Sequence, residues 1–254
     1  ELEMMGARVF KTPKELADNS NIIITMVTGP KDVNQVLFGS NGVIKSSNKN
    51  LIIVDMSTIG PSAAKNISKK LNNYKIKFLD APVTGSTPAA KSGELTIFVG
   101  GNKKLFEKLK PTFHTMGKNV FYIGPTGSGQ SIKLINNLLI GITTAAVAES
   151  MLLADIEGLS RYKVAQFLDN SPIVSSYTRM KMKNMVNGDY TTFFSIRNIN
   201  KDLKLALREL TNSKVSLPTL HKVSKIFEKS VRQGLGEEDL SAVIKYIKKI
   251  KGKN

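Results

Sequence analysis

Lys133 is the only ionisable side chain between Gln130 and Ala148, a stretch that reads QSIKLINNLLIGITTAAVA. A helix that is apolar on nearly every face belongs inside a protein, where an ammonium group is costly unless something there needs it. Burial favours the neutral amine, which can accept a proton at neutral pH, so Lys133 is the first candidate for acid–base chemistry. Asn136 and Asn137 follow on the same helix face. The alternative is a lysine at the wet start of the helix, whose stem covers apolar neighbours.

Three earlier segments have the small residues that a chain needs where it passes close to a ligand. Two are polar turns after expected strands, VTGPKD at residues 27–32 and STIGP at residues 57–61. Ligands of α/β sheets bind at the carboxyl ends of parallel strands, although each turn could simply cap the helix that follows. The third, DAPVTGSTPAAKSG at residues 80–93, leaves one strand and returns to another; it is either a ligand loop or a plain glycine-rich turn.

Composition narrows the classes of function. The chain has 254 residues, 41% of them hydrophobic, which is enough for one large or two smaller globular domains. Without cysteine and with two histidines, we expect no metal site and a cytoplasmic protein. Polar residues interrupt the longest apolar run, so we expect no membrane span. The net charge of +17 is scattered, which favours a solvated lysine-rich surface over a nucleic-acid site.

Hydrophobic patterns divide the chain near residue 126. Short β-rich runs alternate with helical patterns before it, which is typical of an α/β sheet with crossovers. We expect parallel strands at residues 22–27, 51–55, 76–81, 95–99 and 120–123. After it we expect only helices, at residues 130–157, 160–169, 174–187, 200–211, 218–233 and 238–249. The prediction is an α/β domain over residues 1–126 and an all-α domain over residues 127–254, joined by the long helix.

Six segments carry a family resemblance. They are VLFGSNGV, VDMSTIGP, DAPVTGSTPAAKSGELTIFVGG, GSGQSIKLINN, NKDLKLALRE and GLGEEDLSAVIK. In this order they resemble the signature blocks of the β-hydroxyacid dehydrogenase family, which includes 3-hydroxyisobutyrate dehydrogenase. The resemblance extends over essentially the whole chain and implies a Rossmann-like first domain, an all-helical second domain for substrate binding and dimerisation, and NAD or NADP as the cofactor.

The resemblance also implies roles for residues that contact the substrate. Lys133 matches the catalytic lysine, and Asn137 matches its partner on the next helical turn. Thr84, Gly85 and Ser86 fall in the loop that holds the substrate carboxylate, where the family more usually has Ser-Gly-Gly. This departure leaves the identity of the substrate open.

Cofactor contacts are implied in the same way. Val27 and Thr28 match the turn that lies along the dinucleotide, where the family often has Leu-Pro. Asp32 falls on a further cofactor position, Thr58 lies near the nicotinamide ribose, and Lys201 lies beside the cofactor. The choice between NAD and NADP is normally set in a part of the fold that this sequence does not contain.

One family feature is absent from the sequence. The family opens with a strand, a GxGxxG turn and a helix that binds the pyrophosphate, and no GxGxxG occurs in the chain. By the size of a βαβ unit, roughly 30 or more residues would precede Glu1, so we expect the dinucleotide-binding domain to be N-terminally incomplete. The other possibility is a protein that has lost its hold on the dinucleotide.

We therefore expect an oxidoreductase that moves a hydride between the nicotinamide and a small 3-hydroxy acid or its semialdehyde. Lys133 would be the general acid/base, Asn137 would orient the reacting oxygen, and the loop of residues 84–86 would fix the substrate carboxylate. By resemblance we also expect a homodimer or homotetramer. The alternative is a non-catalytic, dehydrogenase-like scaffold that binds protein or nucleic acid through its basic helical half.

Overall fold

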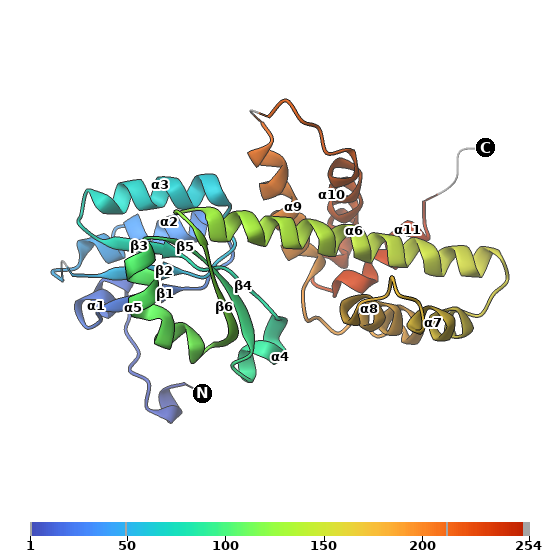
Figure 1. The fold of residues 1–254 in the computed structure, drawn as a ribbon, viewed down its shortest axis with the longest axis horizontal. Coiled ribbons are helices and arrows are strands. Elements are labelled where there is room, and N and C mark those ends of the chain that lie inside the picture. Colours follow the sequence, from blue (N-terminus) through green and yellow to red (C-terminus); the bar gives the residue numbers. More distant parts are fainter. Residues whose placement is uncertain (1, 49, 212, 251–254) are drawn as a thin grey trace. The chain divides into compact units, whose positions relative to one another are not determined.

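The computed structural model describes residues 2–48, 50–211 and 213–250. The chain forms two compact units, Glu1–Lys133 and Leu134–Asn254. The first combines a sheet with helices and the second is helical (Figure 1). The predicted fold class, an α/β part followed by an all-α part, is confirmed.

The first unit follows the expected alternation of strands and helices. Its strands are β1 (Ile22–Thr25), β2 (Ile52–Asp55), β3 (Lys77–Asp80), β4 (Val83–Thr84), β5 (Leu95–Gly101) and β6 (Gly117–Gly124). Its helices are α1 (Pro13–Asp18), α2 (Pro30–Phe38), α3 (Pro61–Asn72), α4 (Ser86–Lys91) and α5 (Lys103–His114), with 3-10 turns at Glu3–Met5 and Val43–Lys45. A proline at the first helical position, preset to helical φ, begins α1, α2 and α3.

The sheet has the strand order β1-β2-β3-β5-β4, with β6 paired to β5. Strands β1, β2 and β3 are parallel, and β5 and β6 are parallel. Between these groups β5 runs antiparallel to β3, and β4 runs antiparallel to β5. The sheet is therefore mixed rather than parallel throughout, because the short α4 segment turns the chain back where a full crossover would have kept its direction.

Helices cover both faces of this sheet (Figure 1). Ile53 and Phe78 pack with α1, α2 and α3 in one buried cluster. Their neighbours along the strands, Val54 and Leu79, pack with α5 in the other cluster. Successive strand residues point to opposite faces, so a strand covered on both faces is apolar throughout. Strand β2 shows this directly, since all four of its residues are buried.

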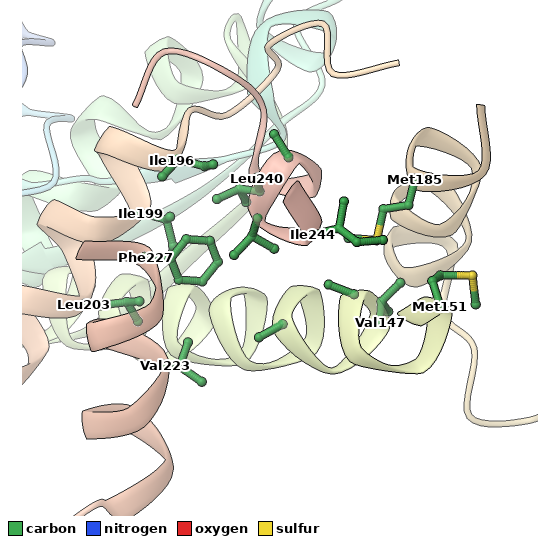
Figure 2. Close-up of a cluster of buried hydrophobic side chains, with 14 of the residues drawn as sticks. Val147, Met151, Met185, Ile196, Ile199, Leu203, Val223, Phe227, Leu240 and Ile244 are labelled. Atoms are coloured by element: carbon green, nitrogen blue, oxygen red, sulfur yellow. The ribbon is translucent and has the colours of Figure 1, made fainter. Parts of the chain in front are cut away.

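The second unit is built on a long first helix. Its helices are α6 (Ser128–Ile156), which begins in the first unit, α7 (Arg161–Asp169), α8 (Ser176–Asn187), α9 (Ile196–Glu209), α10 (Pro218–Ser230) and α11 (Val243–Ile247). A π-helical turn at Val231–Leu235 follows α10, and a 3-10 turn at Leu240–Ala242 precedes α11. Figure 2 shows the core, in which buried side chains of α6, α8, α9, α10 and α11 form one cluster.

Local capping explains where the helices differ from the predicted bounds. Helix α9 begins at Ile196 rather than residue 200, because the Ser195 side chain accepts a hydrogen bond from the Asn198 amide. The last predicted helix is shorter, since Asp239 caps the 3-10 turn that precedes α11. Asp239 is also ion-paired with the buried Lys181, whose Nζ lies 2.6 Å from its Oδ1. Burial would raise the pKa of Asp239, but hydrogen bonds from Lys181 and Ser241 hold it below its ordinary range.

Helix α6 corrects the expectation that no apolar run in the chain is long enough to cross a membrane. By length and mean hydropathy alone it is long and apolar enough to cross a membrane, with a mean hydropathy of 1.6 over an 18-residue window. Core helices of globular proteins can pass the same test. Ala145, Ala148 and Met151 are buried in the core of the second unit, and the Thr144 hydroxyl shares a hydrogen bond with Tyr177. We therefore assign α6 to the core of the helical unit.

Candidate active site

The amino end of α6 is fixed by a buried carboxylate at the end of β3. Asp80 has no exposed surface, and its two oxygens accept hydrogen bonds from the backbone amides of Gly127, at 2.7 Å, and Gln130, at 3.0 Å. Burial raises the pKa of Asp80, while these amide hydrogen bonds act against that rise. A Cβ added at Gly129 would lie 2.3 Å from the Phe98 carbonyl oxygen, so only glycine allows this close approach. The start of the helix is therefore held firmly in place.

The side chain of Gln130 joins the same helix to the turn after β2. Its Oε1 accepts hydrogen bonds from the amides of Ile59, at 2.9 Å, and Gly60, at 3.1 Å, and its Nε2 donates to the Ser57 carbonyl at 2.8 Å. Gln130 has no exposed surface. A buried amide with donor and acceptor both satisfied fixes its partners in one arrangement. The turn of residues 57–60 is thus attached to the start of α6 by hydrogen bonds.

Asp55 joins this turn to the one after β1. Its Oδ1 accepts a hydrogen bond from the Thr25 hydroxyl at 2.8 Å and another from the Ser57 amide at 3.2 Å. The Ser57 hydroxyl in turn accepts from the Val27 amide at 2.9 Å. Burial, assisted by the nearby charge of Asp80, raises the pKa of Asp55 to about 6. The two turns at the carboxyl ends of parallel strands therefore form one connected edge.

The predicted cofactor residues of the first unit lie along this edge. Val27 and Thr58 are half-buried, while Thr28 and Asp32 are exposed, with Asp32 in the first turn of α2. Both α2 and α3 follow a glycine, and in the described structure neither has a side-chain cap on its first amides. Uncapped helix amides donate hydrogen bonds to anionic and hydroxyl oxygens. Small residues and helix amino ends of this kind can accommodate the ribose and phosphate groups of a dinucleotide.

The predicted substrate loop is a strained turn between β4 and α4. Thr84 is half-buried, and Gly85 and Ser86 are exposed. Gly85 has φ 133° and Ser86 has φ 62°, both in the left-handed region that favours glycine. A Cβ at Gly85 would lie 2.7 Å from the Ala89 Cβ. Ser86 therefore adopts a backbone conformation that favours glycine, at the position where the family that the sequence resembles more usually has glycine.

Lys133 and Asn137 lie four residues apart on α6, a rise of roughly 6 Å along the axis. Lys133 is 8% exposed and Asn137 is fully buried, so the alternative of a solvated lysine at the helix start is wrong. Asn137 Nδ2 donates to Asp202 Oδ2 at 2.6 Å, and its Oδ1 accepts from Asn136 at 3.1 Å.

The structure brings Asn137 and Lys201 together through a residue that the sequence analysis did not single out. Asp202 binds Asn137 and lies 3.0 Å from Lys201 Nζ by its other oxygen. It is 2% exposed although it stands in a charged segment, NKDLK. Asp55, Asp80 and Gln130 were missed in the same way. The signal for Asp55 and Asp80 was a lone polar residue at the end of an apolar run, which also occurs in ordinary turns, and Gln130 had no such signal.

Comparisons with known proteins agree with this arrangement. Residues 1–124 match the family model described as the NAD binding domain of 6-phosphogluconate dehydrogenase. Residues 127–247 match the model described as the NAD-binding domain of NADP-dependent 3-hydroxyisobutyrate dehydrogenase. Because both parts match dehydrogenase domains, the alternative of a non-catalytic scaffold is not favoured.

Individual relatives match over nearly the whole chain. It is 35% identical to 2-(hydroxymethyl)glutarate dehydrogenase of Eubacterium barkeri, over 97% of this chain and 82% of that protein. It is 34% identical to 2-hydroxy-3-oxopropionate reductase of Escherichia coli K12, over 96% of this chain and 84% of that protein. A crystal structure of 3-hydroxyisobutyrate dehydrogenase from Salmonella typhimurium superimposes with a TM-score of 0.81 and 30% identity, over 92% and 82% of the two chains. The chain therefore belongs to the β-hydroxyacid dehydrogenase family and is an oxidoreductase that uses NAD or NADP.

Proposed function

We propose that this protein interconverts a small 3-hydroxy acid and its semialdehyde, with Lys133 as the general acid/base. The observation that carries the proposal is the burial of Lys133 on a helix whose start is fixed by Asp80 and Gln130. The nicotinamide cofactor supplies or accepts the hydride, so the protein has to provide orientation and one proton. A lysine that is buried in an apolar helix and held in a defined place can supply or accept that proton.

The proton transfer follows from the chemistry of the amine. When the alcohol is oxidised, neutral Lys133 accepts the hydroxyl proton, and in the reverse direction its ammonium returns the proton. Asn137 orients the reacting oxygen. One of its two Nδ2 hydrogens goes to Asp202, and its Oδ1 accepts from Asn136, so the second Nδ2 hydrogen is left to donate to the reacting oxygen while the hydroxyl proton goes to Lys133.

The carboxylate of the substrate is assigned to Thr84, Gly85 and Ser86. In the described part of the chain the Thr84 and Ser86 hydroxyls have no hydrogen-bond partner, so both can donate to a carboxylate. Gly85 allows a ligand to approach the backbone closely. The relatives named above act on small acids, which supports a small carboxylate substrate.

The cofactor is assigned to Val27, Thr28, Asp32, Thr58 and Lys201. Support comes from the connected edge formed by the turns after β1 and β2, and from the ion pair of Lys201 with Asp202. We assign residues 1–126 to dinucleotide binding and residues 127–254 to substrate binding and dimerisation.

A homodimer or homotetramer is also proposed. The second unit exposes large apolar side chains along α6 and α7 that a monomer would leave in water. They are Leu139, Leu153, Ile156, Leu159, Tyr162 and Phe167. Residence in the cytoplasm stays a prediction.

The function is tested by hydride transfer with purified Lys133→Ala protein and a panel of small 3-hydroxy acids, followed by NAD(P)H absorbance. We expect turnover to collapse while cofactor affinity stays nearly unchanged. Lys118→Ala, an exposed lysine of β6, is the matched control and keeps full activity. Retention by Lys133→Ala of more than about a tenth of the rate, roughly 1.4 kcal/mol of barrier, would refute the assignment.

A further inference from the structure

A cavity in the first unit is surrounded by lysines and lies outside the site described above. Its volume is about 880 Å³. The lysines that line it are Lys65 and Lys69 of α3, Lys75 in the turn before β3, Lys77 at the start of β3, and Lys104 and Lys108 of α5. All six are exposed, whereas Ile76, Phe78 and Leu105, which also line the cavity, are buried. The cavity therefore has an apolar floor and a cationic rim.

The topology of the sheet explains why a cavity exists there. Strands β3 and β5 pair only through Leu79 with Gly101 and Asp80 with Gly100. Just outside this short ladder, Phe78 on one strand and Asn102 after the other line the cavity. Helix α3 flanks it from one face of the sheet and α5 from the other face. The cavity adjoins the amino end of β3, whereas the candidate cofactor turns follow the carboxyl ends of β1 and β2.

The charges around this cavity are not balanced by the protein. No acidic residue lines it, and within the described part of the chain none of the six lysines forms an ion pair. Lys65 and Lys69, and likewise Lys104 and Lys108, are spaced four apart on their helices, an arrangement that places like charges together and destabilises a helix. An anion in the cavity would remove this repulsion.

Lys75 adds a separate observation. Its φ is 58°, in the left-handed region that is unfavourable for a residue with a Cβ, and glycine or asparagine would occupy it at lower cost. Strained positions of this kind are found where a side chain serves binding. Here the strained residue is one of the six that surround the cavity.

From these observations we infer that this cavity binds a small ligand with a chain of two or three phosphate groups, such as a nucleoside triphosphate. Six lysines around one cavity match a multiply charged anion better than a single sulfate-sized ion. The volume is that of a small-molecule site, and the apolar floor offers a surface for a base. Ser68, Asn72 and Thr126 add polar groups to the lining. This second site is additional to the proposed dehydrogenase function.

The test is calorimetric titration of the full-length protein with inorganic triphosphate and, separately, ATP, in 150 mM salt without divalent cations. Lys77→Gln combined with Lys104→Gln should weaken binding at least tenfold. The matched control combines Lys163→Gln with Lys225→Gln, two exposed lysines of α7 and α10, and should change affinity less than twofold. Similar affinities for ATP and triphosphate would support recognition of the phosphate chain alone, and tighter binding of ATP would support a base on the apolar floor.

A further variant separates binding from folding. Lys75→Asn removes one charge and suits the left-handed backbone, so it should weaken triphosphate binding several-fold while the melting temperature stays the same or rises. Either of two results would overturn the inference: no binding at millimolar triphosphate, or an equal loss of affinity in the control variant. Tighter binding of duplex DNA than of triphosphate, lost in the same variants, would also overturn it.

Discussion

The Oε1 atom of Gln130 lies 2.9 Å from the backbone nitrogen of Ile59, which places one buried amide between two functional segments. Lys133 follows Gln130 by three residues and so lies on the same side of α6. Thr58, an assigned cofactor residue, precedes Ile59 in the turn after β2. The helix that carries the proposed proton donor and the turn that is assigned to the cofactor are therefore held together by a single side chain.

Replacing Gln130 by leucine tests this coupling. The change leaves the amides of Ile59 and Gly60 and the Ser57 carbonyl buried without partners, which should cost on the order of 3 kcal/mol of unfolding free energy. Because the turn then loosens, we expect a higher KM for the cofactor as well as a lower kcat. Urea denaturation and steady-state kinetics measure both. Gln166→Leu on the exposed face of α7 is the matched control and should leave both values unchanged.

Unchanged cofactor KM in Gln130→Leu, together with the expected loss of stability, would assign Gln130 to folding alone. Gln130→Glu adds a second comparison. It keeps the acceptor oxygens for Ile59 and Gly60 but removes the donor to Ser57 and buries a charge beside Asp80. We expect it to be at least as damaging as the leucine variant.

Ser86 offers a test of the substrate loop. Ser86→Gly relieves the left-handed strain and removes the hydroxyl, whereas Ser86→Ala removes only the hydroxyl. The glycine variant should be more stable than the alanine variant by about 1 kcal/mol. If the hydroxyl binds the substrate carboxylate, both variants should raise the KM for the acid and leave that for the cofactor unchanged. Thermal melting measures the difference in stability, and steady-state kinetics measures the two KM values. An unaltered substrate KM in both variants would show that the Ser86 hydroxyl does not bind the substrate.

Asp202 is predicted to position Asn137 rather than to touch the reacting atoms. Asp202→Ala leaves the buried Asn137 Nδ2 without its acceptor, which should cost about 1 to 3 kcal/mol of stability. Activity should fall mainly in kcat, and Asp202→Asn, which still offers an acceptor oxygen, should recover part of it. Asp155→Ala removes an exposed ion pair with Arg161 and should cost less than about 1 kcal/mol. A normal kcat in Asp202→Ala would contradict the positioning role.

Much of the fold follows from local sequence patterns. Prolines at 13, 30 and 61 mark helix starts because a proline is tolerated in the first turn, and the structure begins helices at all three. The apolar run that contains β2 indicates burial on both faces, as found. Short elements escaped prediction: β4 and α4 hold too few residues for a hydrophobic period to show.

The residues of the candidate site also fall into two groups, those that the sequence predicts and those that it does not. Lys133 stands out because a charge interrupts an apolar helix, which is a local contrast visible in the sequence. Asp80 and Gln130 do not stand out, because their partners lie about 50 and 70 residues away in the chain. Only the pairing of strands and the seating of α6 bring those groups together. The lysine-lined cavity is equally invisible in the sequence, since its residues come from three separate segments.

Asp55 gives the last prediction, which concerns pH. Its pKa of about 6 in the folded protein lies above its ordinary value of 3.8, so between these values the folded state binds the proton more readily than the unfolded chain. The contribution of this group to stability is therefore most favourable at low pH and is lost as the pH rises through 6. Asp55→Asn removes this dependence and can keep an acceptor oxygen for Thr25 and Ser57.

We therefore expect the unfolding free energy of the wild type, minus that of Asp55→Asn, to fall by roughly 1 to 3 kcal/mol between pH 4 and pH 7. Urea denaturation at several pH values measures the difference. Asp18→Asn is the control with the opposite sign, because hydrogen bonds from Lys14, Ser46 and Ser47 hold the pKa of Asp18 below its ordinary range. Its stabilising contribution is present at neutral pH and is lost on acidification. A difference for Asp55 that stays flat over this range, while Asp18 shows its slope, would mean that Asp55 titrates normally and that the edge it joins is more solvated than its burial indicates.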